Sequence, residues 1–238
     1  MDHFIYHASL IITSILNLLL AVFMLWKNNK YRKYKHYYRT RCLTVVWLVA
    51  FGIGYLLHAF FQWRYSWATA ASALAVSYFH IGALCFSWGY TPLLNPKYLT
   101  KKVIVRDLMI FFTGLIIYWT VAIAIPYAPI LTIFSFGFFF AYAAYIAFVF
   151  YSTYNRITYR IMKMDTGNVI GFIKWMQACC DLIVVFGIGS VGLTAAFPLE
   201  IWPYSLLLWA GFGMFSYMVY SVNKYATVID STKDVLGH

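Results

Sequence analysis

The chain begins with the apolar stretch FIYHASLIITSILNLLLAVFMLW, from Phe4 to Trp26, in which no Asp, Glu, Lys or Arg occurs. The next stretch, KNNKYRKYKHYYRTR from Lys27 to Arg41, contains seven Lys and Arg residues. An apolar run of about 20 residues can cross ~30 Å of hydrocarbon as one helix. A basic run directly after it holds that end on the cytoplasmic side. The two stretches therefore predict a membrane-spanning helix whose N-terminus lies outside.

The composition of the whole chain agrees with a membrane protein. Of the 238 residues, 63% are hydrophobic and only 11% are charged, whereas soluble domains carry about 25% charged residues. A soluble fold with so little polar surface would expose too much hydrocarbon to water. The first apolar stretch lacks a basic segment before it and a small-residue cleavage site after it, so we expect a retained helix rather than a signal peptide.

Seven apolar stretches along the chain are long enough to span a bilayer. They are Phe4–Trp26, Leu43–Gln62, Ala70–Leu94, Leu108–Ile125, Ile130–Tyr151, Ala178–Phe197 and Tyr204–Val222. We therefore predict an all-α integral membrane bundle of seven transmembrane helices over residues 1–222. Residues 223–238 form a polar tail in which Tyr225, Ile229, Thr232 and Leu236 recur at helical spacing. This spacing predicts the start of a cytoplasmic signalling helix.

The basic residues predict the orientation of the bundle. In this arrangement Arg64 is the only one of the 18 Lys and Arg residues that falls on the same side as the N-terminus. The side rich in Lys and Arg faces the cytoplasm, so we predict an N-out, C-in topology. We expect the chain to be a multi-pass protein of the cell inner (cytoplasmic) membrane. The net charge of +11 is then a topology signal. We expect Lys27–Arg41 to lie against anionic head groups and this segment not to bind nucleic acid directly.

One motif resembles a nucleotide-binding fingerprint. The stretch Gly187–Gly192 reads GIGSVG, but no strand precedes it and no helix begins after it, so we do not interpret it as a dinucleotide site. Small residues inside a span instead predict close helix packing. The same interpretation applies to Gly52, Gly54, Gly211 and Gly213.

Three histidines are the most informative polar residues within the spans. His7, His58 and His80 fall at broadly similar depth in the outer half of three helices, near Arg64. Intramembrane ionisable groups tend to face the bundle interior, so these four residues are candidates for one ligand-binding cavity. Metal or haem ligation, with His58 and His80 as ligands, is an alternative use of the imidazoles that we do not expect, and the cofactor stays unknown. Alternatively, each histidine only hydrogen-bonds a neighbouring helix.

Asp181 is a candidate buried charge or switch in the sixth span. A carboxylate there needs a partner or a raised pKa. Lys174 lies seven residues earlier on the same helical face and is a candidate ion-pair partner. A proton-coupled role is the alternative. We find no nucleophile–base pair, paired carboxylates or phosphate loop in the sequence, so we do not expect an enzyme.

Four further stretches are informative together: HIGALCFSWGYTPLLNP (80–96), WMQACCDLI (175–183), GIGSVGLTAAFPLEIWPY (187–204) and NKYATVID (223–230). They resemble the N-terminal seven-helix sensor domain of bacterial membrane-anchored AraC-type regulators or histidine kinases. The resemblance implies a sensory or receptor domain that passes an external or membrane-derived signal to a cytoplasmic output domain or partner protein. The sequence leaves open whether the chain forms a homodimer. A small-solute transporter or channel is the alternative function.

Overall fold

A computed structural model describes residues 2–26, 28–124, 129–163, 167–196 and 200–226. Within these ranges the chain is helical and contains no strand. Seven of the helices are long and apolar enough to cross a membrane. The predicted fold class, an all-α membrane bundle of seven spans, is confirmed, and the chain is a multi-pass membrane protein.

The bounds of the helices differ from the predicted spans mainly at the ends. In chain order they are α1 Asp2–Trp26, the 3₁₀ turn η1 Asn28–Tyr31, α2 Lys35–Phe61, α3 Trp63–Ser66, α4 Ala68–Leu94, α5 Lys101–Ala124, α6 Pro129–Lys163, α7 Gly167–Ala196 and α8 Trp202–Tyr225. Helices α6 and α7 both continue into the segment between the predicted spans Ile130–Tyr151 and Ala178–Phe197. Hydropathy marks where a helix leaves hydrocarbon, whereas helical hydrogen bonding can continue into the polar region.

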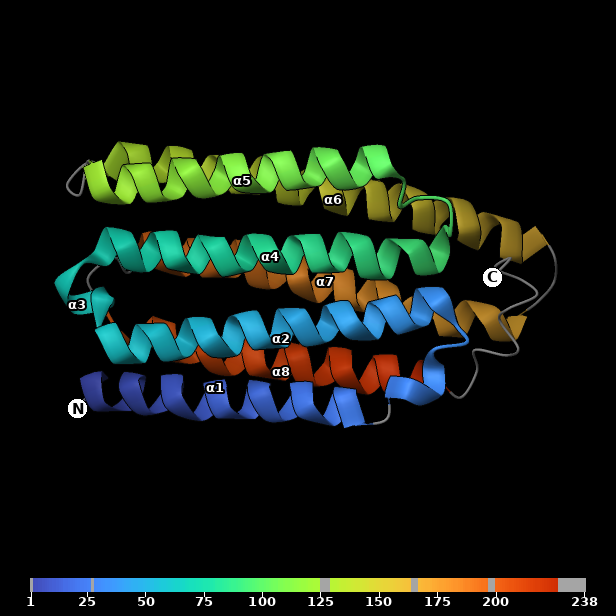
Figure 1. The fold of residues 1–238 in the computed structure, drawn as a ribbon, viewed down its shortest axis with the longest axis horizontal. Helices are drawn as coiled ribbons and strands as arrows, with labels where there is room; N and C mark the ends of the chain where they lie inside the picture. The colour runs from blue at the N-terminus through green and yellow to red at the C-terminus, as the bar shows by residue number, and fades with distance from the viewer. Residues whose placement is uncertain (1, 27, 125–128, 164–166, 197–199, 227–238) are drawn as a thin grey trace.

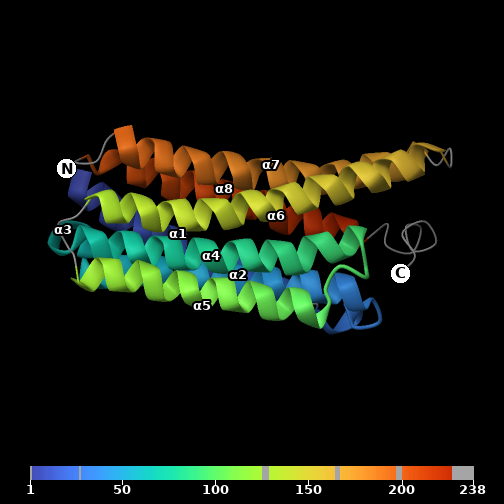
Figure 2. The same ribbon diagram turned by 90° about the horizontal axis from the view of Figure 1, so that it is seen from above.

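The helices form two layers (Figures 1 and 2). Helices α1, α2, α4 and α5 lie side by side in a curved row, and α8, α7 and α6 form the second row. Helix α7 packs mainly against α6 and α8 and approaches α2 and α4 less closely. We call the end of the bundle that holds the N-terminus and α3 the outer end, after the predicted orientation, and the opposite end the inner end.

Glycines allow close packing in only part of the bundle. A Cβ atom on Gly54 would lie 2.5 Å from the ring of Tyr78, and one on Gly82 would lie 2.3 Å from Nε1 of Trp47. These contacts explain the close approach of α2 and α4. The packing interpretation is also confirmed for Gly52 and Gly211, where a Cβ would meet neighbouring side chains at 2.9 and 3.1 Å.

The same interpretation is wrong for three of the predicted packing glycines. A Cβ on Gly187, Gly189 or Gly213 would meet no described atom within 4 Å. Gly213 lies on an exposed face of α8. Gly187 and Gly189 lie on α7, the helix that stands off from the first layer. At these two positions the missing side chain leaves open space instead of bringing two backbones together.

Arg41 corrects the prediction for the basic run. We had expected Lys27–Arg41 to lie against head groups, but α2 already begins at Lys35 and the Arg41 side chain is only 1% exposed. Its Nη2 donates to the Met24 carbonyl oxygen at 2.6 Å, and its guanidinium lies 4.7 Å from the centre of the Tyr31 ring. A cation beside the last carbonyl groups of a helix is favourable, because those groups are partly negative and unpaired within the helix. Arg41 therefore fixes the inner end of α1.

Candidate functional site

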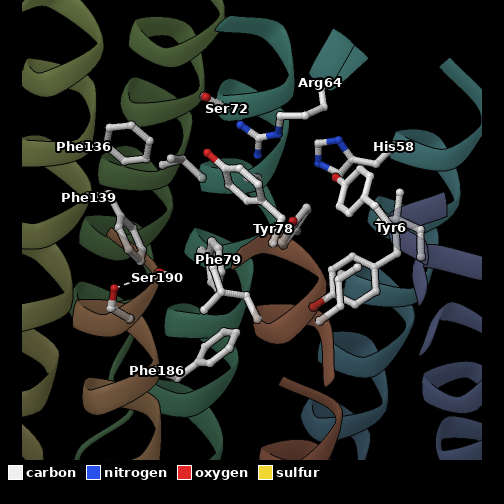
Figure 3. A pocket seen from close by; sticks show the side chains of 18 residues that line it. Tyr6, His58, Arg64, Ser72, Tyr78, Phe79, Phe136, Phe139, Phe186 and Ser190 are labelled. Atoms are coloured by element: carbon white, nitrogen blue, oxygen red, sulfur yellow. Dashed lines mark hydrogen bonds between the residues drawn. The ribbon is translucent and has the colours of Figure 1, made fainter. Parts of the chain in front are cut away.

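A pocket opens at the outer end of the bundle, between α7 and the first layer of helices. Its empty volume is about 800 Å³, and α1, α2, α3, α4, α6, α7 and α8 all contribute to its wall. We call it the outer pocket. Its described wall includes Tyr6, His58, Arg64, Ser72, Tyr78, Phe79, Phe136, Phe139, Phe186, Ser190 and Tyr204. Figure 3 shows Arg64 reaching in from α3, with His58 and Tyr6 on one side and Phe136 and Phe139 on the other.

The chain positions Arg64 by a sharp reversal after α2. Gln62 adopts a left-handed conformation with φ 48°, which is uncommon for a residue with a side chain. Its backbone N–H donates to the His58 carbonyl oxygen at 3.1 Å and closes the end of α2. The single turn of α3 follows directly and directs Arg64 over the pocket. This geometry turns the only basic residue predicted on the outer side towards the interior of the bundle.

The environment of Arg64 leaves part of its hydrogen-bonding capacity unused. Its guanidinium lies 3.9 Å from the centre of the Tyr204 ring, a close cation–π contact. Its Nε atom is buried and has no hydrogen-bond partner in the described part of the chain. No described Asp or Glu lines the pocket, and the only ion pair between described residues lies elsewhere, at Arg106 and Asp107. The pocket therefore offers a positive charge to an incoming group.

His58 adds a second polar group to the same wall. Its side chain is 4% exposed and stands edge-on to the Tyr78 ring, with 6.1 Å between the ring centres. Its Nδ1 is buried and meets no hydrogen-bond partner among the residues that the structure describes. A buried polar atom without a partner costs free energy, about 1–3 kcal/mol, so it favours a ligand that supplies one.

A second space, which we call the apolar groove, lies next to the outer pocket towards the middle of the bundle. It has an empty volume of about 850 Å³, and its described lining residues are uncharged and almost all apolar, with the indole N–H of Trp47 and the Cys180 thiol as the exceptions. The two spaces share Phe79, Phe139, Phe186 and Gly187 as wall residues. The site is therefore polar at its outer end and mainly hydrophobic below.

The structure brings His58 and Arg64 together but directs His80 elsewhere. His80 is fully buried, with Nδ1 3.1 Å from the Tyr118 hydroxyl of α5, and its ring packs on Phe111 and Tyr142. Residues two apart on a helix point about 200° away from each other. Because Tyr78 faces the outer pocket, His80 faces α5 and α6.

His7 is also absent from the wall of the outer pocket. Tyr6 and Leu10, four residues apart on α1, line it, so half-buried His7 is rotated by about 100° from that face. The outer pocket thus brings together His58 and Arg64 and leaves out His7 and His80. No group of three or more His, Cys, Asp or Glu residues within the described ranges could hold a metal ion, and a metal shared by His58 and His80 finds no support.

Asp181 does not form the ion pair that we predicted. Its Oδ1 accepts a hydrogen bond from the Tyr151 hydroxyl of α6. Lys174 is exposed, and no ion pair with Asp181 occurs among the described residues. Seven residues correspond to about 10 Å along a helix, a long reach for the two side chains, whereas the tyrosine lies on the neighbouring helix at the same depth.

The sequence interpretation missed a polar cluster at the inner end. Asp107 has a fully buried side chain that accepts from Arg106 at 2.7 Å and from Nε1 of Trp88 at 2.8 Å. Arg106 also donates to the Tyr145 hydroxyl at 2.6 Å. Nearby, the hydroxyls of Ser87 and Tyr98 are 2.9 Å apart, and burial raises the pKa of Tyr98 above its ordinary value. The available signal was a lone carboxylate next to a basic run at the start of a span.

The aromatic wall of the outer pocket was missed as well. The tyrosines at positions 6, 55, 78 and 204 all line it, yet none was a candidate in the sequence.

Comparison of the chain with protein-family models, with curated proteins and with solved structures found no match.

Proposed function

We propose that this bundle is a transmembrane receptor domain of the cell inner membrane. It recognises a ligand in the outer pocket and passes the signal along α8 to a cytoplasmic output domain or partner protein. One observation carries the proposal: α8 contributes to the outer pocket at one end and to a buried hydrogen-bond cluster at the other. Tyr204 and Leu208 line the pocket, whereas Asn223 accepts a hydrogen bond from Arg41 at 2.8 Å.

The contact between Arg64 and Tyr204 supplies the ligand-sensitive element. The guanidinium rests on the first turn of α8 through this ring. A ligand that draws Arg64 into a new hydrogen bond competes with the cation–π contact, which is worth about 0.5–2 kcal/mol. A ligand shifts a conformational equilibrium only through such a difference in interaction between two states. Binding therefore acts directly on the outer end of α8.

Specific hydrogen bonds hold the inner end of α8. The Tyr37 hydroxyl donates to the Val222 carbonyl oxygen at 2.7 Å, next to the bond between Arg41 and Asn223. A rigid helix transmits a rotation or shift from one end to the other, and close-packed contacts favour discrete arrangements over continuous deformation. These contacts thus define the resting arrangement that a signal would change.

The test fills the outer pocket by mutation and measures the inner end of α8. The variant Gly187→Trp adds an indole where a Cβ meets no described atom within 4 Å, on a wall of both the pocket and the groove. Gly189→Trp is the matched control, since Gly189 lies on the same helix with equal space but lines neither. Spin labels introduced as unnatural amino acids at exposed Lys97 and Lys224 report the distance across the inner end by pulsed electron resonance in nanodiscs.

We expect Gly187→Trp to shift the distance distribution and Gly189→Trp to leave it unchanged. An unchanged distribution in Gly187→Trp, or the same shift in both variants, would remove the coupling between the pocket and α8 and with it the receptor proposal.

A small-solute transporter is the second candidate. It is favoured by the shared wall of the outer pocket and the apolar groove, which together extend from the outer end towards mid-membrane. Half-buried Asp181, which follows the groove residue Cys180 on α7, would be the coupling group. Solute accumulation in proteoliposomes driven by a proton or sodium gradient, with loss on Asp181→Asn, would establish transport in place of reception.

A further inference from the structure

We infer that the ligand of the outer pocket is a single-chain amphiphile with one anionic head group. The head lies beside Arg64 and His58, and the hydrocarbon chain lies in the apolar groove. This inference rests on the proposed use of the outer pocket as the ligand site. It adds the chemical class of the ligand and the direction from which the ligand enters.

The head group follows from charge and unused hydrogen-bonding capacity. Among the described residues, the half-buried guanidinium of Arg64 faces the pocket, and its buried Nε has no hydrogen-bond partner. The buried and unpartnered Nδ1 of His58 lines the same space. A planar guanidinium matches a carboxylate or phosphate by paired hydrogen bonds, which are stronger than bonds between neutral groups. One cation and no described carboxylate in the wall select a single anion.

The hydrocarbon chain follows from the groove below. On α4, Ser72 lines the outer pocket and Phe86 lines the groove. These two residues are separated by about 20 Å along the helix axis. A compact polar solute would leave this apolar length unfilled, whereas an extended hydrocarbon chain occupies it. Gly187 lines both spaces, and a Cβ there would meet no described atom within 4 Å. The passage that we assign to the hydrocarbon chain runs beside this glycine.

The groove also reaches the lipid-facing surface between α6 and α7. Ile188, which lines the groove, is 61% exposed, and Ala144 on α6 is an exposed wall residue as well. In a membrane this exposed surface faces acyl chains, so a hydrocarbon chain can pass sideways from the bilayer without entering water. The ligand therefore reaches the site from the outer leaflet, with its head group at the depth of Arg64.

The experiment measures binding of tritiated hexadecanoate to the protein in phosphatidylcholine nanodiscs by scintillation proximity, with the signal of empty nanodiscs subtracted. Hexadecanol at equal mole fraction tests the head group, and butyrate tests the chain. We expect saturable binding and competition by unlabelled hexadecanoate. Hexadecanol should compete with an affinity at least about tenfold lower than that of hexadecanoate, which is the loss predicted for one charge-assisted hydrogen bond. Butyrate should not compete, because each buried methylene contributes roughly a fourfold gain in affinity relative to water.

Two variants test the two halves of the site separately. Arg64→Gln should weaken hexadecanoate binding about tenfold, with partial recovery in Arg64→Lys. Gly187→Trp should abolish binding by closing the passage, whereas Gly189→Trp should retain it. Size-exclusion profiles of all four variants establish that the protein is folded. Adding lysophosphatidylglycerol, a phospholipid with one acyl chain, identifies the source of the anion, since displacement of hexadecanoate assigns the head to a phospholipid and resistance assigns it to a free carboxylate.

No saturable binding, equal competition by hexadecanol, or full binding by Arg64→Gln would overturn the inference. These failures are distinct from failure of the receptor proposal. Hexadecanoate binding without any movement of α8 removes reception and keeps the ligand class. Movement of α8 in Gly187→Trp, together with no saturable hexadecanoate binding by the unsubstituted protein, keeps reception and removes the ligand class.

Discussion

Arg41 and Asn223, which are 182 positions apart in the chain, are joined by a hydrogen bond of 2.8 Å from Nη1 to Oδ1. Asn223 in turn donates from Nδ2 to the Val219 carbonyl oxygen at 2.8 Å, which fixes its orientation on α8. The bond links the first part of α2 to the end of α8, and Nη2 of the same guanidinium holds α1. One buried cation thus connects three helix ends at the inner surface.

The first prediction concerns this connection. Asn223→Leu removes an acceptor from a buried charged donor and should lower the free energy of unfolding by about 1–3 kcal/mol. Thermal unfolding in detergent micelles, followed by circular dichroism, measures the change. Lys224→Leu is the matched control, because Lys224 is the next residue and is exposed. Equal effects of the two substitutions would show that the bond to Arg41 does not stabilise the bundle.

The second prediction concerns the ion pair at the inner end of α4 and α5. Asp107→Asn keeps an acceptor for Trp88 but removes the charge that faces Arg106. The Arg106 side chain is 37% exposed and can turn towards water, so the cost should fall at the low end for a broken pair, about 1–3 kcal/mol. The same unfolding measurement applies.

Asp181→Asn is the control for that substitution. An asparagine there can still accept from the Tyr151 hydroxyl, so we expect a change below about 1 kcal/mol. A larger loss of unfolding free energy for Asp181→Asn than for Asp107→Asn would contradict our expectation that Asp107 contributes more to stability than Asp181.

Depth in the membrane could be predicted from the sequence, but the direction in which each side chain points could not. Hydropathy and charge located the spans and placed His58, His80 and Arg64 near the outer half. Direction requires an amphipathic pattern, and lipid-facing residues are as apolar as buried ones. His80 and Tyr78 therefore looked equivalent, although they face opposite sides of α4. Only the contacts of Tyr78 with α2 and of His80 with α5 distinguish them.

The same limit explains the errors on glycine. Gly54 and Gly187 are identical as sequence features inside an apolar span. Gly54 faces the tightly packed helix α4, whereas Gly187 faces open space because α7 stands off from the first layer. Which helices approach closely depends on all seven spans together, and no local stretch of sequence contains this information.

The third prediction uses this contrast between glycines. Gly54→Ala places a Cβ 2.5 Å from the Tyr78 ring, which is too close without a shift, so it should destabilise the bundle by about 1–3 kcal/mol. Gly213→Ala adds the same methyl group on an exposed face and should stabilise by about 0.5–1 kcal/mol through helix propensity. Thermal unfolding of the two variants should move in opposite directions. A shift of the same sign would contradict the packing assigned to α2 and α4.

The fourth prediction concerns orientation. Alkaline phosphatase, which is active only outside the cytoplasm, should be inactive when fused after Val222 and active when fused after Ser66 at the end of α3. A cytoplasmic reporter should give the opposite pattern, because the basic residues hold the inner end in the cytoplasm. Phosphatase activity after Val222 would overturn the N-out, C-in assignment and would place Arg64 and the outer pocket on the cytoplasmic side.

The last prediction concerns how the signal leaves the bundle. Helix α8 continues to Tyr225, and of the predicted signalling segment 223–238, residues 227–238 lie outside the described residues. If the output depends on helical phase, two residues inserted after Tyr225 should abolish or invert it, because they rotate everything beyond by about 200°. Seven inserted residues add nearly two full turns, about 700°, and should restore the original phase and most of the output. A histidine kinase domain fused after His238 gives the readout as autophosphorylation. Hexadecanoate binding should be unchanged in both insertions, since the outer pocket lies at the opposite end of α8. Equal output after two and seven inserted residues would rule out signalling through a continuous helix and would favour a tether that only brings the output domain to the membrane.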